Sequence, residues 1–155
     1  MSPELNYEVV SMKEVPLGQP LRDGQKERLV LVVDDERIIA DTLSVILSRA
    51  GFSVMKAYDG ESALKLASGA MPDLLLSDVM LGPGMDGTQL AIEMVEACPG
   101  CKVLLFSGHA ATANLLAQAR AQGHDFTLMS KPVHPADLLA RLTESFAPTG
   151  ARMGA

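Results

Sequence analysis

The stretch Leu-Val-Leu-Val-Val-Asp-Asp, residues 29–35, decides the fold. Its first five residues form a continuous apolar run, which is typical of a strand buried on both faces of a parallel sheet. Apolar residues then recur at helical spacing from Ile38 to Leu47, until Gly51 ends the helix. A buried strand followed by an amphipathic helix predicts one βα unit.

The same alternation continues along the chain. Further strands are predicted at residues 53–57, 74–76, 103–106 and 126–129, and helices over about 63–67, 90–95, 112–121 and 138–146. Five strands that alternate with five helices predict an α/β fold with an open, doubly wound, five-stranded parallel sheet. In such sheets, ligands bind outside the carboxyl ends of the strands.

The two ends of the chain lack this pattern. Residues 1–27 contain several Pro and Gly residues without sustained periodicity and predict a flexible leader, and residues 147–155 predict a C-terminal tail. The run from Tyr7 to Met12 could form a strand or dock on a partner, but we assign it to the leader. The folded domain is therefore expected over residues 28–146.

The composition excludes several classes of function. A net charge of −6 and 4% aromatic residues argue against direct binding of nucleic acid. The chain has neither an apolar stretch long enough to span a membrane nor the pattern of a signal peptide. Two cysteines are too few for the disulfide framework of a secreted protein. We therefore expect a cytoplasmic protein that binds no membrane and no nucleic acid directly.

Polar residues stand at the ends of the predicted strands. Asp34 and Asp35 follow the first strand, Asp78 the third, Ser107 the fourth and Lys131 the fifth. Crowded carboxylates repel one another unless a cation lies between them, and an all-oxygen set suits Mg²⁺. A lysine and a serine hydroxyl can each contact a phosphoryl oxygen. The pattern predicts a Mg²⁺ site in which a carboxylate accepts a phosphoryl group.

Five short motifs resemble the response-regulator receiver family, in the family's order. They are V-L-V-V-D-D-E (residues 30–36), L-L-L-S-D-V-M (74–80), M-D-G (85–87), F-S-G (106–108) and K-P (131–132). Each motif alone is weak, but the set is specific, and the resemblance covers about residues 28–146. It implies a flavodoxin-like sheet of strand order 2-1-3-4-5 and a chemotaxis-type, stand-alone receiver of a bacterial two-component system.

The resemblance also implies a metal-binding set. Asp35 and Asp78 would bind Mg²⁺ directly, and Asp34 would act largely through water. The backbone carbonyl of Met80 would complete the metal sphere.

The remaining roles concern the phosphoryl group. Asp78 would be the phosphoacceptor, Lys131 would contact the phosphoryl group, and Ser107 would follow that group when the protein switches. A cis peptide bond between Lys131 and Pro132 is also implied.

The implied activity is that of a signalling switch rather than an enzyme, with self-catalysed phosphotransfer and dephosphorylation. A histidine kinase or histidine phosphotransfer protein would supply the phosphoryl group. An unknown downstream protein would then bind the surface around the fourth helix and the fifth strand.

Two features depart from the family pattern. The loop from Asp78 to Gly87 is one residue longer than the commonest form. Leu128 stands where the family usually has an aromatic switch residue, three positions before Lys131. Phe126 should lie on the same strand face and could partly substitute for that residue.

Other interpretations of these residues remain open. Asp34 and Asp35 could cap the first helix, and Asp78 could be a loop acid near a helix start. The chain could also be a receiver-like interaction module that phosphate does not control. Cys98 and Cys101 form a C-x-x-C motif that a thiol redox protein could use, although no helix N-terminus follows them to lower a thiol pKa.

The three histidines are interpreted separately. His124 and His134 are expected to be surface or capping residues. His109, two positions beyond Ser107, could border the phosphoryl site and, with Met80, tune the lifetime of the acyl phosphate.

Overall fold

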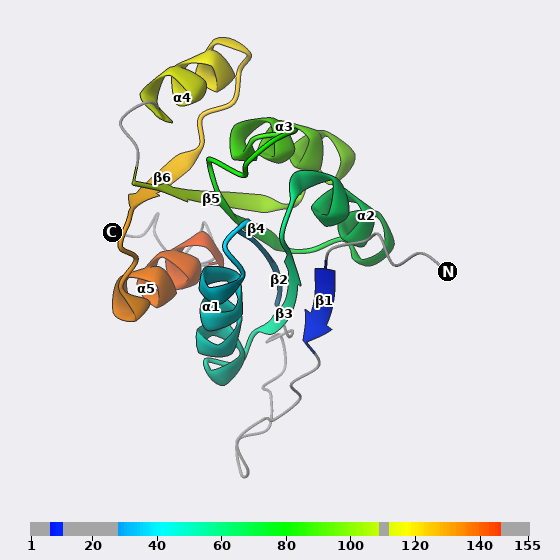
Figure 1. Ribbon diagram of the computed structural model, residues 1–155, viewed down its shortest axis with the longest axis vertical. Coiled ribbons are helices and arrows are strands. Elements are labelled where there is room, and N and C mark those ends of the chain that lie inside the picture. Colours follow the sequence, from blue (N-terminus) through cyan, green and yellow to red (C-terminus); the bar gives the residue numbers. More distant parts are fainter. Residues whose placement is uncertain (1–6, 11–27, 109–111, 147–155) are drawn as a thin grey trace, which may run out of the picture.

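The computed structural model describes residues 7–10, 28–108 and 112–146 (Figure 1). Its strands are β1 (Tyr7–Val10), β2 (Leu29–Val33), β3 (Ser53–Ala57), β4 (Leu74–Asp78), β5 (Lys102–Ser107) and β6 (Thr127–Ser130). Its helices are α1 (Arg37–Arg49), α2 (Gly60–Ala70), α3 (Gly87–Ala97), α4 (Thr112–Ala121) and α5 (Pro135–Phe146). The predicted alternation of strands and helices is confirmed from residue 29 to residue 146.

The strands form one sheet of order β1-β3-β2-β4-β5-β6. All neighbours from β3 to β6 pair in parallel, so the five predicted strands have the order 2-1-3-4-5, as the resemblance implied. The observed bounds of the last two strands differ from the predicted ones by one residue at each end, which is ordinary for strand limits read from a pattern.

The sheet contains one strand more than predicted. Strand β1 pairs antiparallel with β3, with Tyr7 opposite Ala57 and Val10 opposite Val54. Assignment of the Tyr7–Met12 run to a leader was therefore wrong for residues 7–10. The physical reason is that β3 would otherwise be an edge strand with unpaired backbone groups, and a short run rich in strand-forming residues satisfies them.

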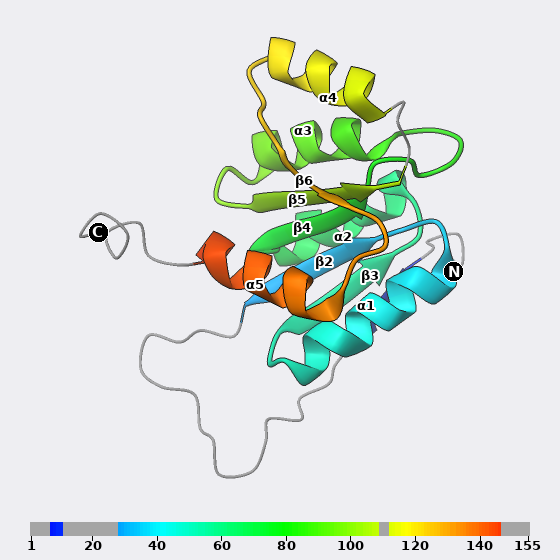
Figure 2. The ribbon, with the colours of Figure 1, turned by 90° about the vertical axis from the view of Figure 1, so that its left-hand side faces the viewer.

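Helices cover both faces of the sheet (Figures 1 and 2). Alternate strand residues point to opposite faces, so Leu31 and Val33 lie in the core cluster beneath α2 and α3, whereas Val30 and Val32 lie in the cluster beneath α1 and α5. Because both faces are buried, the central strand β2 is apolar throughout, and β4 is apolar up to its polar end. None of the helices in the described residues is long and apolar enough to cross a membrane.

Two aspartates fix the starts of helices near the carboxyl ends of the strands. The Asp59 side chain accepts a hydrogen bond from the Ser62 N–H at 2.7 Å and caps α2. The Asp86 side chain accepts one from the Gln89 N–H at 2.9 Å and caps α3. Helix α1 begins after Glu36, which provides no side-chain cap.

Candidate functional site

The sheet register brings the polar strand ends to one edge. Ser77 lies opposite Val33, the last residue of β2, and Asp78 lies opposite Phe106. Ser107 in turn lies opposite Ser130, the last residue of β6. Because Asp34 and Asp35 directly follow β2 and Lys131 directly follows β6, all the residues predicted from the strand ends meet along this edge.

Asp78 is buried and both of its carboxylate oxygens have partners. Lys131 Nζ lies 2.8 Å from Oδ2, and the Met80 backbone N–H donates to Oδ1 at 3.2 Å. Burial lowers the pKa of Lys131, but the hydrogen bond to Asp78 and the attraction of Asp34 and Asp78 outweigh it and raise that pKa overall. Lys131 is therefore held as a cation against Asp78.

Asp34 is fully buried and only partly hydrogen-bonded. Its Oδ1 accepts a hydrogen bond from the Glu36 N–H at 2.9 Å. Its Oδ2 has no hydrogen-bond partner among the described residues and lies 3.6 Å from Lys131 Nζ. Burial raises the pKa of Asp34 to about 6, opposed by the bond from Glu36 and supported by the negative charge of Asp78.

The three aspartates form a cluster that fits a divalent cation. Asp34, Asp35 and Asp78 each offer one carboxylate oxygen, and these oxygens lie within 4.8 Å of one another. A buried carboxylate oxygen without a hydrogen bond is costly unless a cation or water satisfies it, and Asp34 Oδ2 is such an atom. An all-oxygen donor set with one exposed member suits Mg²⁺, which keeps several of its waters.

Ser107 and Lys131 are connected through their backbones. The Lys131 N–H donates to the Ser107 carbonyl at 3.1 Å, and the Ser107 side chain is buried at the end of β5. The peptide bond between Lys131 and Pro132 is cis, as the resemblance implied. Met80, by contrast, has an exposed side chain and faces the site through its backbone.

Gly87 is a site-forming residue that the sequence named only as part of a motif. Its N–H donates to the Val79 carbonyl at 2.7 Å, and a Cβ at this position would overlap the carbonyl oxygen of Asp78. Glycine therefore allows α3 to begin directly against the segment that carries Asp78. The M-D-G motif is the sequence signal for this packing.

The longer loop after β4 approaches the aspartate cluster. Gly82 has a φ of +79°, and a Cβ placed on it would lie 3.3 Å from Asp35 Oδ2. Gly84, with a φ of +93°, faces Glu61 instead. Both positions favour glycine because other residues rarely adopt this backbone conformation.

The capping interpretations do not fit two of the aspartates. The N-cap residue of α1 is Glu36 rather than Asp35, and that of α3 is Asp86 rather than Asp78. Asp34 does accept a hydrogen bond from the Glu36 N–H, which shapes the turn before α1. Asp35 and Asp78 are thus placed in the cluster without serving as helix caps.

The two cysteines do not form an exposed thiol site. Cys98 and Cys101 are free and buried, and both belong to the core cluster beneath α2 and α3. Burial, with the neighbouring Cys98 and Asp73, raises the pKa of Cys101 to about 12. Because the thiolate is the reactive form, this environment argues against the thiol redox interpretation.

Two of the histidines and the switch position lie on either side of β6 or within it. His109 lies outside the described residues. His124 stacks on Phe126 with ring centroids 5.7 Å apart, and His134 is exposed. Phe126 and Leu128 pack against the same core cluster, so the expectation that they share one face is confirmed.

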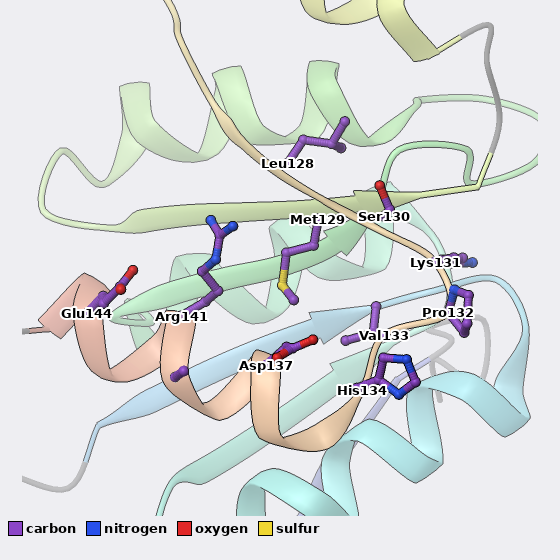
Figure 3. Close-up of a pocket in the computed structure, with 11 residues that line it drawn as sticks. Leu128, Met129, Ser130, Lys131, Pro132, Val133, His134, Asp137, Arg141 and Glu144 are labelled. Carbon is purple, nitrogen blue, oxygen red and sulfur yellow. The ribbon is translucent and has the colours of Figure 1, made fainter.

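A pocket of about 640 Å³ lies between β6 and α5 (Figure 3). Lys131 and Pro132 lie at one end of it, and Arg141 and Glu144 lie toward the other. The pocket thus adjoins the strand end that carries Lys131.

Comparisons with known proteins agree with this arrangement. The family model described as "Response regulator receiver domain" matches residues 30–143. The chain is 35% identical over 128 residues to the probable transcriptional regulatory protein TcrX of Mycobacterium tuberculosis, covering 83% of this chain and 53% of that protein. It is 34% identical over 113 residues to the alkaline phosphatase synthesis transcriptional regulatory protein PhoP of Bacillus subtilis, covering 73% and 46%. The chain spans about half the length of these relatives.

Solved structures show the same fold. A CheY-like response regulator receiver domain protein from Methanospirillum hungatei superposes with a TM-score of 0.70 at 29% identity, covering 77% of this chain and 94% of that one. A CheX-CheY-BeF3-Mg²⁺ complex from Borrelia burgdorferi also matches with a TM-score of 0.70, at 26% identity, covering 81% and 94%. From its motifs, its strand order, its aspartate cluster and these matches, the chain belongs to the response regulator receiver domain family.

Proposed function

We propose that this chain is a Mg²⁺-dependent phosphorylation switch in which Asp78 accepts a phosphoryl group. The observation that carries the proposal is the placement of Lys131 Nζ against Asp78 Oδ2, at 2.8 Å, beside a buried and unsatisfied oxygen of Asp34. A lysine, an acceptor carboxylate and further carboxylates able to hold Mg²⁺ are the parts that phosphoryl transfer to an aspartate needs.

In the proposed reaction, a carboxylate oxygen of Asp78 attacks the phosphorus of a phosphohistidine. An O–P bond forms, the P–N bond breaks, and its electron pair remains on the imidazole of the donor. When bound, Mg²⁺ would neutralise phosphoryl oxygens, and Asp34, Asp35, Asp78 and the Met80 carbonyl are the groups that we propose to hold it. Lys131 would transfer its contact from Asp78 to a phosphoryl oxygen, and Ser107 would donate a hydrogen bond to another.

We propose a histidine kinase or histidine phosphotransfer protein as the phosphoryl donor and the surface of α4, β6 and α5 as the output side. The pocket beside Lys131 supports this choice, because a movement of Lys131 would alter its wall (Figure 3). With Leu128 at the usual aromatic position, Phe126 is the aromatic residue placed to couple β6 to α4. The downstream partner is a protein in this proposal.

The bounds of the receiver unit and the kinds of partner that it binds also belong to this proposal. The family match over residues 30–143 supports a receiver unit of residues 28–146, to which β1 adds a strand from the segment before it. Absence of direct nucleic-acid binding stays a prediction, because relatives such as MtrA of Mycolicibacterium smegmatis are named DNA-binding response regulators. The stand-alone role and a cytoplasmic location also stay predictions.

Labelling with acetyl phosphate tests the proposal. We expect phosphate incorporation by the parent protein only when Mg²⁺ is present, and none by the Asp78→Asn variant with an unchanged circular dichroism spectrum. Mass spectrometry should place the phosphate on Asp78. An equal level of labelling in Asp78→Asn, placed on another residue, would remove Asp78 as the acceptor. A parent that is never labelled would favour a receiver-like interaction module that phosphate does not control.

A further inference from the structure

The acidic loop between β2 and α1 is attached at both ends to the end of β3 and the residue that follows it. At its start, the Asp34 N–H donates to the Ala57 carbonyl at 3.3 Å. At its end, the Arg37 guanidinium lies over the Tyr58 ring, 4.0 Å from the ring centroid. Asp35 lies between these two attachments, so the position of its carboxylate depends on residues 57 and 58.

Tyr58 is itself held firmly against α1. Its side chain is buried in the core cluster beneath α1 and α5, and its hydroxyl donates to Asp41 Oδ1 at 2.8 Å. Lys56 Nζ lies 2.9 Å from the same oxygen. Arg37 and Asp41 are four residues apart and therefore lie on one face of α1. The Tyr58 ring thus contacts the first residue of the helix, and its hydroxyl contacts the helix one turn later.

The start of α1 lacks a cap from the side chain of its N-cap residue, although the Glu36 N–H donates to Asp34. Glu36, the N-cap residue of α1, provides no side-chain cap, and the first turn contains no acidic residue that would favour the helix dipole. The contacts of Arg37 and Asp41 with Tyr58 therefore act together with the Asp34 hydrogen bond in orienting the start of α1.

We propose that Tyr58 is a positioning residue for the metal site, acting through Arg37 and Asp41 to hold Asp35 within reach of Asp34 and Asp78. The proposal rests on the Mg²⁺ binding of the proposed function. Tyr58 would touch neither the metal nor the phosphoryl group. Loss of its contacts should weaken Mg²⁺ binding while leaving the phosphotransfer step intact at saturating Mg²⁺.

The Arg37→Gln variant gives the sharpest test. Electrostatics alone and loss of positioning predict changes of opposite sign in the Kd for Mg²⁺. Arg37 is two residues from Asp35, so removal of its positive charge should, by electrostatics alone, strengthen Mg²⁺ binding. Loss of positioning should instead raise the Kd for Mg²⁺ by about two- to fivefold, the factor that corresponds to an exposed cation–π contact. Arg37 is exposed, so this variant should fold normally, and Arg37→Lys should retain most of the affinity.

Tyr58 variants separate the ring from the hydroxyl. Tyr58→Phe keeps the ring beneath Arg37 and should change the Kd less than Tyr58→Leu, which removes both contacts. Phe52→Leu is the matched control, because Phe52 packs on the same core cluster and pairs with Phe146 at a centroid distance of 6.1 Å, near the other end of α1. It should lower stability without changing the Kd.

Mg²⁺ titrations followed by the amide signals of Asp35 and Asp78 give the Kd, and acetyl phosphate labelling at saturating Mg²⁺ gives the transfer rate. A folded Tyr58→Leu and an Arg37→Gln that both bind Mg²⁺ as tightly as the parent, or more tightly, would overturn the positioning role. A parent protein that binds no Mg²⁺ would instead overturn the proposed function, so the two failures can be distinguished.

Discussion

Lys131 Nζ lies 2.8 Å from Asp78 Oδ2 and 3.6 Å from Asp34 Oδ2, so one ammonium group faces two buried carboxylates. This arrangement balances part of the negative charge of the cluster. In the proposed function, Lys131 would exchange Asp78 for an incoming phosphoryl oxygen without leaving the site.

Substitution of Lys131 by Ala should slow acetyl phosphate labelling of Asp78 by about 10²-fold, because a preorganised cation that stabilises developing charge is lost. Mg²⁺ binding should be retained or strengthened, since the ammonium group no longer competes with the metal ion. Lys102→Ala removes an exposed lysine at the opposite end of β5 and serves as the control. Unchanged labelling of Lys131→Ala, measured at saturating Mg²⁺, would contradict the assigned role.

The Asp35→Ala variant tests the metal-ligand assignment through stability. Because Asp35 is not the N-cap of α1, its loss should not carry the cost of a lost cap and should relieve repulsion in EDTA. Mg²⁺ at ten times its Kd should stabilise the parent by about 1.4 kcal/mol and the variant hardly at all. Denaturant unfolding measures both. Glu36→Ala is the matched control, and equal Mg²⁺ stabilisation of parent and Asp35→Ala would remove Asp35 from the ligand set.

Asp34 should make stability depend on pH in a direction opposite to that of an ordinary ion-paired carboxylate. Its pKa of about 6 in the folded protein lies above 3.8, the ordinary value of an aspartate, so the folded state binds the proton more tightly than the unfolded state. Stability should therefore rise as the pH falls from about 8 to about 4.5, by on the order of 2 kcal/mol.

This pH effect is best measured in EDTA as the difference in the free energy of unfolding between the parent and Asp34→Asn, which lacks the titrating group. The parent should gain stability relative to the variant as the pH falls. Saturating Mg²⁺ should suppress that gain, because a bound cation favours the ionised carboxylate. A parent that instead loses stability relative to the variant over this range would show that Asp34 is not destabilised by burial.

Gly82 and Gly84 provide a matched pair in the longer loop. Alanine at either position should lower the free energy of unfolding by about 1 to 2 kcal/mol, because both residues have positive φ. Only Gly82→Ala should also weaken Mg²⁺ binding, because its Cβ would contact Asp35 Oδ2, whereas that of Gly84→Ala would contact Glu61. Mg²⁺ titration of both variants decides this, and equal affinities would mean that the loop does not shape the metal site.

Phe126, which directly precedes β6, should couple phosphorylation only weakly to the output surface around α4. Phosphorylation changes the output surface only if contacts differ between the two states, and Leu128 has no ring to reorient. Amide chemical shifts around α4 should therefore change little upon phosphorylation, and less still in Phe126→Ala. Phe146→Ala, on α5, is the control. Large shifts that survive in Phe126→Ala would indicate a switch that uses neither residue.

The sequence by itself determined the parallel α/β fold and most of the site. Buried strands such as Leu29–Val33 are apolar on both faces, so they are visible as continuous runs, and the polar residues that end them stand out. Because parallel strands end at one edge, the order of Asp34, Asp78, Ser107 and Lys131 along the chain was enough to predict their meeting. Their individual roles came from the family resemblance.

Only the tertiary structure revealed two features that depend on contacts between residues distant in the sequence. Strand β1 is four residues long and exists through its pairing with β3, more than forty residues later in the chain, so its own sequence could not separate a strand from a tail. The contacts of Tyr58 with Arg37 and Asp41 likewise join a strand end to a helix start. Neither feature leaves a periodic pattern, because each depends on where the sheet and helices place a single residue or a short run.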